Sequence, residues 1–137
     1  ESTKTAKGML GGTIKPDITI SEARIDDYDA IVISGGSGSR KYLWDNKSLH
    51  ELVKEADARK KVVSAICISP VVLARTGILK GKESTVFKSP DTVHELKEHG
   101  AIYLDRDVVV SGRVVTGRDP GSAEAFGKAV LEALKKV

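Results

Sequence analysis

Two short apolar runs predict buried strands in the first half of the chain. Residues 29–34 read DAIVIS and residues 61–67 read KVVSAIC. Neither run alternates between apolar and polar positions, and both are rich in β-branched side chains. That pattern is typical of parallel strands covered on both faces. Each run ends in a turn, Gly35-Gly36-Ser37-Gly38-Ser39 after the first and Ile68-Ser69-Pro70 after the second.

Helical periodicity occupies the segments between and after these runs. Within residues 46–59, apolar side chains recur at i, i+3, i+4 and i+7, which predicts an amphipathic helix with Leu49, Leu52, Val53 and Ala56 inward. A short helix is expected over residues 71–75, ending at Gly77. Ser89-Pro90 predicts the start of a third helix that ends at His99-Gly100. Residues 122–136 predict a closing helix.

The hydrophobic period changes after residue 100. Residues 101–104 and 107–110 predict strands joined by a tight Asp-Arg turn, and Ser111-Gly112 turns the chain into a further strand over 113–116. Shorter strands are expected at residues 13–14, 18–20 and 84–86. Alternating strands and helices with a late antiparallel excursion predict one domain over residues 1–137, a three-layer α/β sandwich with a mostly parallel sheet.

Composition narrows the function classes. The 137 residues include 22 basic and 19 acidic ones, scattered along the chain, for a net charge of +3. Nucleic-acid binders usually concentrate basic residues on one stretch or face, and the densest run, residues 59–61, is expected at a solvated helix end. No apolar run approaches the roughly 20 residues of a membrane span, and no signal peptide is visible. We therefore expect a cytoplasmic protein without a nucleic-acid or membrane partner.

Cys67 is the candidate functional centre. As the only cysteine it cannot form an intrachain disulfide, and no spacing resembles a metal site. A nucleophile between a buried strand and a helix start sits in a sharp turn. The helix dipole there favours a thiolate, and the N–H groups of Ile68 and Ser69 can face an oxyanion. Gly35 and Gly36 end the neighbouring strand at the same edge, where glycines allow their N–H groups to approach a substrate closely. The alternative is that Cys67 is a buried apolar side chain.

Several motifs resemble the ThiJ/PfpI superfamily, which includes the PfpI intracellular proteases and the parkinsonism-associated deglycase. Residues 27–36 resemble its "YDalvlPGG" segment, and residues 65–74 its cysteine elbow "AIC–x–x–P…LA". Residues 8–17, 77–82 and 116–121 match further landmarks in the same order. The resemblance spans nearly the whole chain. It implies a flavodoxin-like, class I glutamine amidotransferase-like fold, a nucleophilic Cys67 and an active-site residue at Arg118, although a surface ion pair is an equal alternative for that arginine.

The departures from the family pattern decide which chemistry is plausible. The protease-like branch has a histidine directly after the cysteine, where this chain has Ile68, and Phe87 stands where relatives often place another histidine. The histidines of the chain, His50, His94 and His99, lie outside the motifs and are expected to be solvated. The deglycase-like branch fits better, but the glutamate of that branch lies in the loop after the family's first strand. We expect this chain to lack that strand and the helix after it, so that the domain is N-terminally incomplete relative to the family.

Four functions remain in competition. The first is a glyoxalase or deglycase that forms a Cys67 hemithioacetal with a small carbonyl substrate and needs no cofactor or metal. The others are a redox-sensing or chaperone-like stress protein, an intracellular cysteine peptidase, and an inactive fragment. An uncovered sheet edge would favour a homo-oligomer or pairing with a missing N-terminal segment. Tyr42 and Trp44 are expected in the core, with a pocket lip or subunit contact as the alternative.

Overall fold

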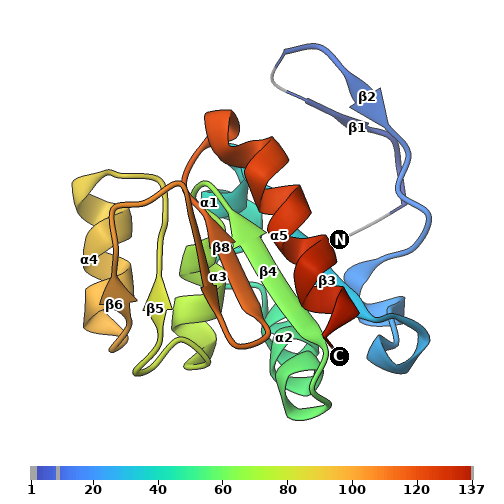
Figure 1. The fold of residues 1–137 in the computed structure, drawn as a ribbon. Helices are drawn as coiled ribbons and strands as arrows, with labels where there is room; N and C mark the ends of the chain where they lie inside the picture. The colour runs from blue at the N-terminus through green and yellow to red at the C-terminus, as the bar shows by residue number, and fades with distance from the viewer. Residues whose placement is uncertain (1–2, 9, 137) are drawn as a thin grey trace.

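A four-stranded sheet forms the centre of the computed structural model, which describes residues 3–8 and 10–136. Its order is β3-β4-β8-β7 (Figure 1). The strands β3 (Ala30–Ile33), β4 (Val62–Ile66) and β8 (Val114–Gly117) run parallel, and β7 (Val108–Ser111) is antiparallel to β8. The carboxyl ends of β3, β4 and β8 therefore meet at one edge, where the predicted turn residues follow them.

Helices cover both faces of this sheet. One face packs against α2 (Lys47–Ala58) and α3 (Pro70–Thr76), and the other against α5 (Ala123–Lys135) (Figure 1). The central strand β4 serves both layers, because Val63 and Ala65 join the core under α2 and α3 while Val62 packs in the cluster with Phe126 of α5. The result is the expected flavodoxin-like three-layer α/β sandwich.

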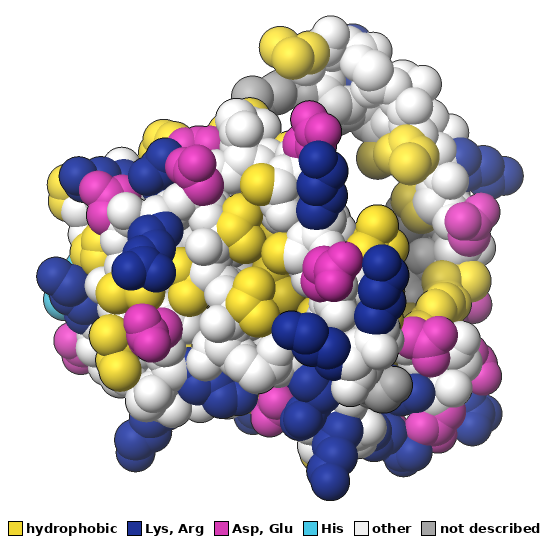
Figure 2. Space-filling view, viewed as in Figure 1, with side chains coloured by type: hydrophobic (Ala, Val, Ile, Leu, Met, Phe, Trp, Pro, Cys, Tyr) yellow, Lys and Arg dark blue, Asp and Glu magenta, His cyan; other side chains and the backbone are white. Residues whose placement is uncertain are grey.

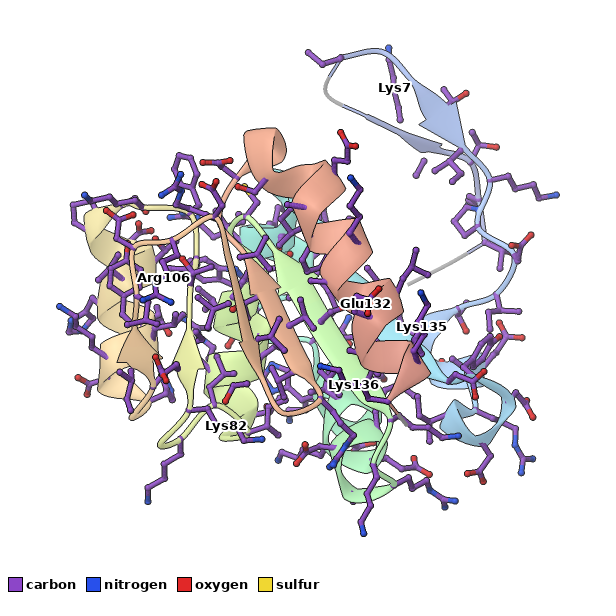
Figure 3. The ribbon with its side chains drawn as sticks, in the orientation of Figure 1. Lys7, Lys82, Arg106, Glu132, Lys135 and Lys136 are labelled. Atoms are coloured by element: carbon purple, nitrogen blue, oxygen red, sulfur yellow. The ribbon has the colours of Figure 1, made fainter. Side chains whose placement is uncertain are left out.

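Local signals set the helix ends where the sequence predicts them. The Asn46 side chain caps α2 by accepting from the N–H of Leu49 at 2.9 Å. The helix α3 begins at Pro70 and ends at Thr76, and the residue that caps it, Gly77, has a φ of +89°. A Ser89 capping box precedes α4 (Pro90–Glu98). Figure 3 shows Glu132 and Lys135 on the outer face of α5, with Lys135 Nζ 3.4 Å from Glu132 Oε1.

The N-terminal segment forms an arm beside the sandwich. The strands β1 (Ala6–Lys7) and β2 (Thr13–Ile14) pair antiparallel, as expected for residues 13–14. The prediction of a strand over residues 18–20 is wrong. A 3-10 turn, η1 (Ile20–Glu22), begins there because Thr19 and the Glu22 carboxylate form a capping box. A second turn, η2 (Ile25–Asp27), leads into β3. Figure 2 shows the arm arching off the body with an opening beneath it.

The pairing expected for the late strands is also corrected. The segments β5 (Glu83–Ser84) and β6 (Ile102–Tyr103) pair parallel in a separate small sheet, so β6 is not the hairpin partner of β7. The N–H of Leu104 bonds the carbonyl of Ser84, which extends this pairing. The turn at residues 111–112 does join the antiparallel strands β7 and β8, as predicted.

The strand β3 lies at an uncovered edge of the main sheet. Among the described residues, β4 is its only strand partner. Its Val32 is 56% exposed, and an apolar groove of about 310 Å³ runs along the strand, lined by residues such as Ile18, Ile31 and Leu52. No helix in the part of the chain that the structure describes is long and apolar enough to cross a membrane.

Candidate active site

Cys67 occupies a sharp turn between β4 and α3. Its φ is +65°, a left-handed conformation that few non-glycine residues adopt. Such backbone strain persists only where surrounding contacts hold it, and it concentrates at functional sites. The side chain is partly exposed. These features match the elbow geometry predicted from the sequence and differ from those of a fully buried apolar cysteine.

Two backbone hydrogen bonds hold Cys67 in this conformation. Its N–H donates to the carbonyl of Gly117 at 3.0 Å, and its carbonyl accepts from the N–H of Phe87 at 2.7 Å. In a trans peptide the carbonyl and the following N–H point in opposite directions. The N–H of Ile68 therefore points away from Phe87, and it donates no backbone hydrogen bond among the described residues. Ile68 thus offers a free donor beside the thiol.

Gly35 approaches the cysteine so closely that no side chain fits there. A Cβ at Gly35 would lie 2.5 Å from Cys67 Cβ and 3.1 Å from the carbonyl oxygen of Ile66. The next residue, Gly36, has a φ of +102°, and its N–H also has no backbone partner among the described residues. Glycine at position 35 is thus required by the elbow itself, a reason that the sequence pattern did not reveal.

A small pocket opens beside the thiol. Its volume is about 200 Å³, and it is lined by Gly35, Gly36, Ile66, Cys67, Pro120 and Ala123. Of these lining residues, only Cys67 has an ionisable side chain. Pro120 begins the 3-10 turn η3 (Pro120–Ser122) after β8, and Ala123 is the first residue of α5. The sequence assigned neither of them to the site, although Pro120 lies in the matched segment 116–121. The pocket therefore offers a thiol, backbone donors and apolar walls.

Ser69 differs from the expectation that its N–H faces a substrate. That N–H donates to the carbonyl of Ile66 at 3.2 Å, which closes the turn. Its hydroxyl donates to the carbonyl of Ser34 at 2.6 Å and lies 2.7 Å from the hydroxyl of Ser39. Ser69 is fully buried. It ties the elbow to the loop after β3, so its role here is structural.

Trp44 supports the elbow from the other side. It follows α1 (Gly38–Tyr42) and is 6% exposed, and its indole N–H donates to the carbonyl of Ile68 at 3.0 Å. The guanidinium groups of Arg40 and Arg75 lie 4.7 and 5.1 Å from its ring centroid. The core position expected for Trp44 is confirmed. The same expectation for Tyr42 is wrong, because that side chain is 65% exposed.

Arg118 follows β8 at the same sheet edge, but three carboxylates surround it. Its Nε lies 3.1 Å from Asp119, one terminal nitrogen lies 3.2 Å from Asp105, and the other pairs with Asp107. Asp119 heads the causes that raise the pKa of Arg118, through a hydrogen bond to the guanidinium. The structure therefore places Arg118 in a surface ion-pair cluster, the alternative weighed for it, and not among the residues that line the pocket.

The three histidines do not reach the thiol pocket. His50 Nε2 lies 2.6 Å from the carbonyl oxygen of Trp44, and His99 Nδ1 lies 2.9 Å from that of Glu95. His94 is on the exposed face of α4, as expected. His50 and His99 are partly buried, which corrects the expectation that they are solvated. The residues lining the pocket include no imidazole, which agrees with the absence of a Cys-His dyad from the motifs.

Comparison with known proteins gives a consistent picture. A profile of the DJ-1/PfpI family matches residues 1–133. An uncharacterized protein of Methanocaldococcus jannaschii is 57% identical over 129 residues, which are 94% of this chain and 63% of that protein. The chain thus spans less than two thirds of that relative's length.

Two further similarities concern activity and fold. A protein of Caenorhabditis elegans named glutathione-independent glyoxalase is 33% identical over 134 residues, 98% of this chain and 70% of that protein. A crystal structure of a ThiJ/PfpI domain protein from Brachyspira murdochii superposes with a TM-score of 0.91 at 32% identity, covering 97% of this chain and 75% of that one.

Proposed function

Since the chain belongs to the DJ-1/PfpI family, we propose that Cys67 is a nucleophile that attacks small carbonyl compounds in a glyoxalase- or deglycase-type reaction. The observation that carries the proposal is the left-handed backbone of Cys67, which sets a partly exposed sulfur beside a small pocket and the free N–H of Ile68. The glyoxalase name of the Caenorhabditis elegans relative supports the same reaction class.

The addition step follows from the residues at the pocket. The Cys67 sulfur attacks the aldehyde carbon of a 2-oxoaldehyde, a C–S bond forms, and the carbonyl π electrons move to oxygen. The N–H groups of Ile68 and Gly36 stabilise that oxygen while it is negative, as donors aimed at a developing oxyanion do. The proton lost by the thiol ends on the oxygen, and the product is a hemithioacetal.

Turnover needs a second proton movement. The hemithioacetal carbon loses its proton, the adjacent carbonyl carbon gains one, and the resulting thioester is hydrolysed by one water. Methylglyoxal plus water then gives lactate, without an external oxidant. The lining residues include no carboxylate or imidazole to move that proton. We therefore expect adduct formation to be much faster than turnover in the chain as given.

Methylglyoxal tests the proposal directly. Intact mass spectrometry should detect one adduct per chain, and lactate should accumulate slowly. The Cys67→Ala variant should form no adduct at this site and lose at least about 100-fold of the lactate rate, as expected for removal of a nucleophile. A wild-type protein that neither forms the adduct nor makes lactate, or a variant as active as wild type, would refute the proposal.

A redox role is the second candidate, supported by the partly exposed single thiol beside free backbone donors. Two equivalents of peroxide would convert the thiol to a sulfinic acid with release of two waters. A mass gain of two oxygens confined to the tryptic peptide containing Cys67 would support it. If the peptide gains no oxygen under mild peroxide, this role is excluded.

A peptidase role gains no support, because the pocket offers no histidine.

We also propose that the open β3 edge mediates self-association. An unpaired strand edge presents free N–H and C=O groups that another strand can bond. The exposed Val32 and the adjoining apolar groove add a hydrophobic contact. A segment N-terminal to residue 1 could occupy the same edge, and a longer form of the chain would then lose the self-association.

A further inference from the structure

Cys67 makes backbone hydrogen bonds with two residues, and each of them is followed directly in the chain by a positively charged residue that pairs with Asp105. Phe87, whose N–H bonds the Cys67 carbonyl, precedes Lys88, and Gly117, whose carbonyl accepts from the Cys67 N–H, precedes Arg118. Lys88 Nζ lies 2.9 Å from Asp105 Oδ2, and Arg118 lies 3.2 Å from Asp105 Oδ1. One carboxylate therefore bridges the two segments that hold Cys67 from opposite sides.

Asp105 lies on the connection between β6 and β7, which passes beside both segments. Figure 3 labels its neighbour Arg106 on this connection, alongside β5. The Arg106 carbonyl accepts from the hydroxyl of Thr85 at 3.0 Å, and the N–H of Thr85 donates to the hydroxyl of Thr116 at 2.9 Å. These inner bonds already order the three segments, so the fold does not depend on Asp105 alone.

We propose that Asp105 is a positioning residue for Cys67: by bridging Lys88 and Arg118, it holds Phe87 and Gly117 where their backbone groups pin the strained cysteine. This inference rests on the proposed function only for its chemical consequence. The bridge itself concerns the geometry of the elbow. It also gives Arg118 a role that does not involve binding a substrate anion.

The charge arrangement supports a network in preference to separate pairs. Isolated surface ion pairs contribute little to stability, whereas several charges with shared partners contribute more. Asp105 uses both carboxylate oxygens, one for each cation, and Arg118 is held in addition by Asp107 and Asp119. A hydrogen bond from Lys88 heads the causes that lower the pKa of Asp105, so this carboxylate is ionised at neutral pH.

Amide hydrogen exchange, followed by NMR, tests the bridge independently of catalysis. In Asp105→Asn, a neutral variant of the same shape, the amides of Cys67 and Phe87 should exchange about tenfold faster than in wild type. Core amides such as those of Val63 and Val115 should keep their rates, since they report on global unfolding. Equal exchange in both proteins, or uniform acceleration of all amides, would overturn the inference.

Asp26→Asn is the matched control. Asp26 pairs with Arg59 at a similarly exposed position, and neither residue lines the thiol pocket. In Asp26→Asn, the amides of Cys67 and Phe87 should exchange as in wild type. Faster exchange of these two amides in the control variant would count against the inference.

Alkylation by iodoacetamide reports the chemical consequence, because the chain has one cysteine. Below the melting temperature, the rate should fall about threefold in Asp105→Asn and remain unchanged in Asp26→Asn. A wild-type thiol no more reactive than free glutathione would refute the proposed function, and the exchange comparison would still decide the bridge. Faster amide exchange with an unchanged alkylation rate would overturn the chemical consequence alone.

Discussion

At the scale of single residues, Gly35 controls how closely the β3 loop approaches the thiol. Replacing it with alanine would place a methyl group 2.5 Å from Cys67 Cβ and 3.1 Å from a backbone oxygen. One of the two segments must then move, and we expect a loss of about 1–3 kcal/mol in the free energy of unfolding, the usual cost of overpacking. Urea denaturation measures this loss, and iodoacetamide alkylation should be altered as well.

Gly127→Ala is the matched control for this prediction. Gly127 lies inside α5, and a Cβ there would meet no atom within 4 Å apart from its chain neighbours and the helix's own backbone. Alanine is favoured over glycine in a helix interior by up to about 1 kcal/mol. The two glycine variants should therefore shift the denaturation midpoint in opposite directions. A Gly35→Ala protein as stable as wild type would show that the close contact at the elbow is absent in solution.

The sequence predicted the position of Cys67 in a sharp turn between a strand and a helix, because an apolar strand, a turn and a proline follow one another directly. It did not predict that the N–H of Ser69 would be engaged, since that bond depends on how tightly the turn closes. The bond from Trp44 to Ile68 spans 24 positions, and Asp105 pairs with Lys88 and Arg118, which lie 17 and 13 positions away. Contacts between such distant residues leave no local pattern to read.

At the scale of elements, one ion pair joins α3 to α4. The Nε of Arg75 lies 2.9 Å from one oxygen of Glu95 and a terminal nitrogen lies 2.8 Å from the other. The hydrogen bond from Arg75 is the largest cause that lowers the pKa of Glu95, and it outweighs burial, which acts in the opposite direction. The pair therefore favours the charged carboxylate in the folded state.

This pair makes stability depend on pH. Its contribution is complete above the ordinary glutamate pKa of about 4.3 and is lost as the pH falls through the lower folded-state pKa. Wild type should exceed Glu95→Gln by about 1–2 kcal/mol at pH 7, the range of hydrogen bonds to charged groups, with a smaller difference at pH 3. Denaturation at both pH values measures this, with Glu98→Gln, exposed on the same helix, as the near-neutral control.

A difference between wild type and Glu95→Gln that stays equal at pH 7 and pH 3 would contradict the ionic origin of the contribution.

The helices α3 and α4 were predictable because their caps and periodicity are local. The pairing of β5 with β6 was not, because each strand has only two residues and the partners lie about a helix apart in the chain.

At the scale of the whole molecule, the two edges of the main sheet differ. The strand β7 at one edge lies against β5, whereas β3 at the other has no further strand among the described residues. Val32→Lys places a charge on the open edge, a substitution that opposes strand pairing. We expect wild type to self-associate as its concentration rises and the variant to remain largely monomeric. Sedimentation velocity over a concentration series measures the difference.

Val110→Lys is the control for the edge. Val110 is 52% exposed on β7, close to the 56% of Val32, but its strand lies at the covered edge. This variant should associate as wild type does. Equal association of all three proteins, or monomers throughout, would show that β3 is not the contact surface.

The left-handed backbone of Cys67 has a consequence for anyone redesigning this scaffold. Holding a side chain in that region costs about 1–3 kcal/mol, which glycine would largely avoid. A design procedure that optimises only the free energy of unfolding would therefore replace Cys67 with glycine, and the stability of the protein would rise. The sulfur would be gone, and with it the chemistry proposed for the molecule. Position 67 should be held fixed while the rest of the surface is varied.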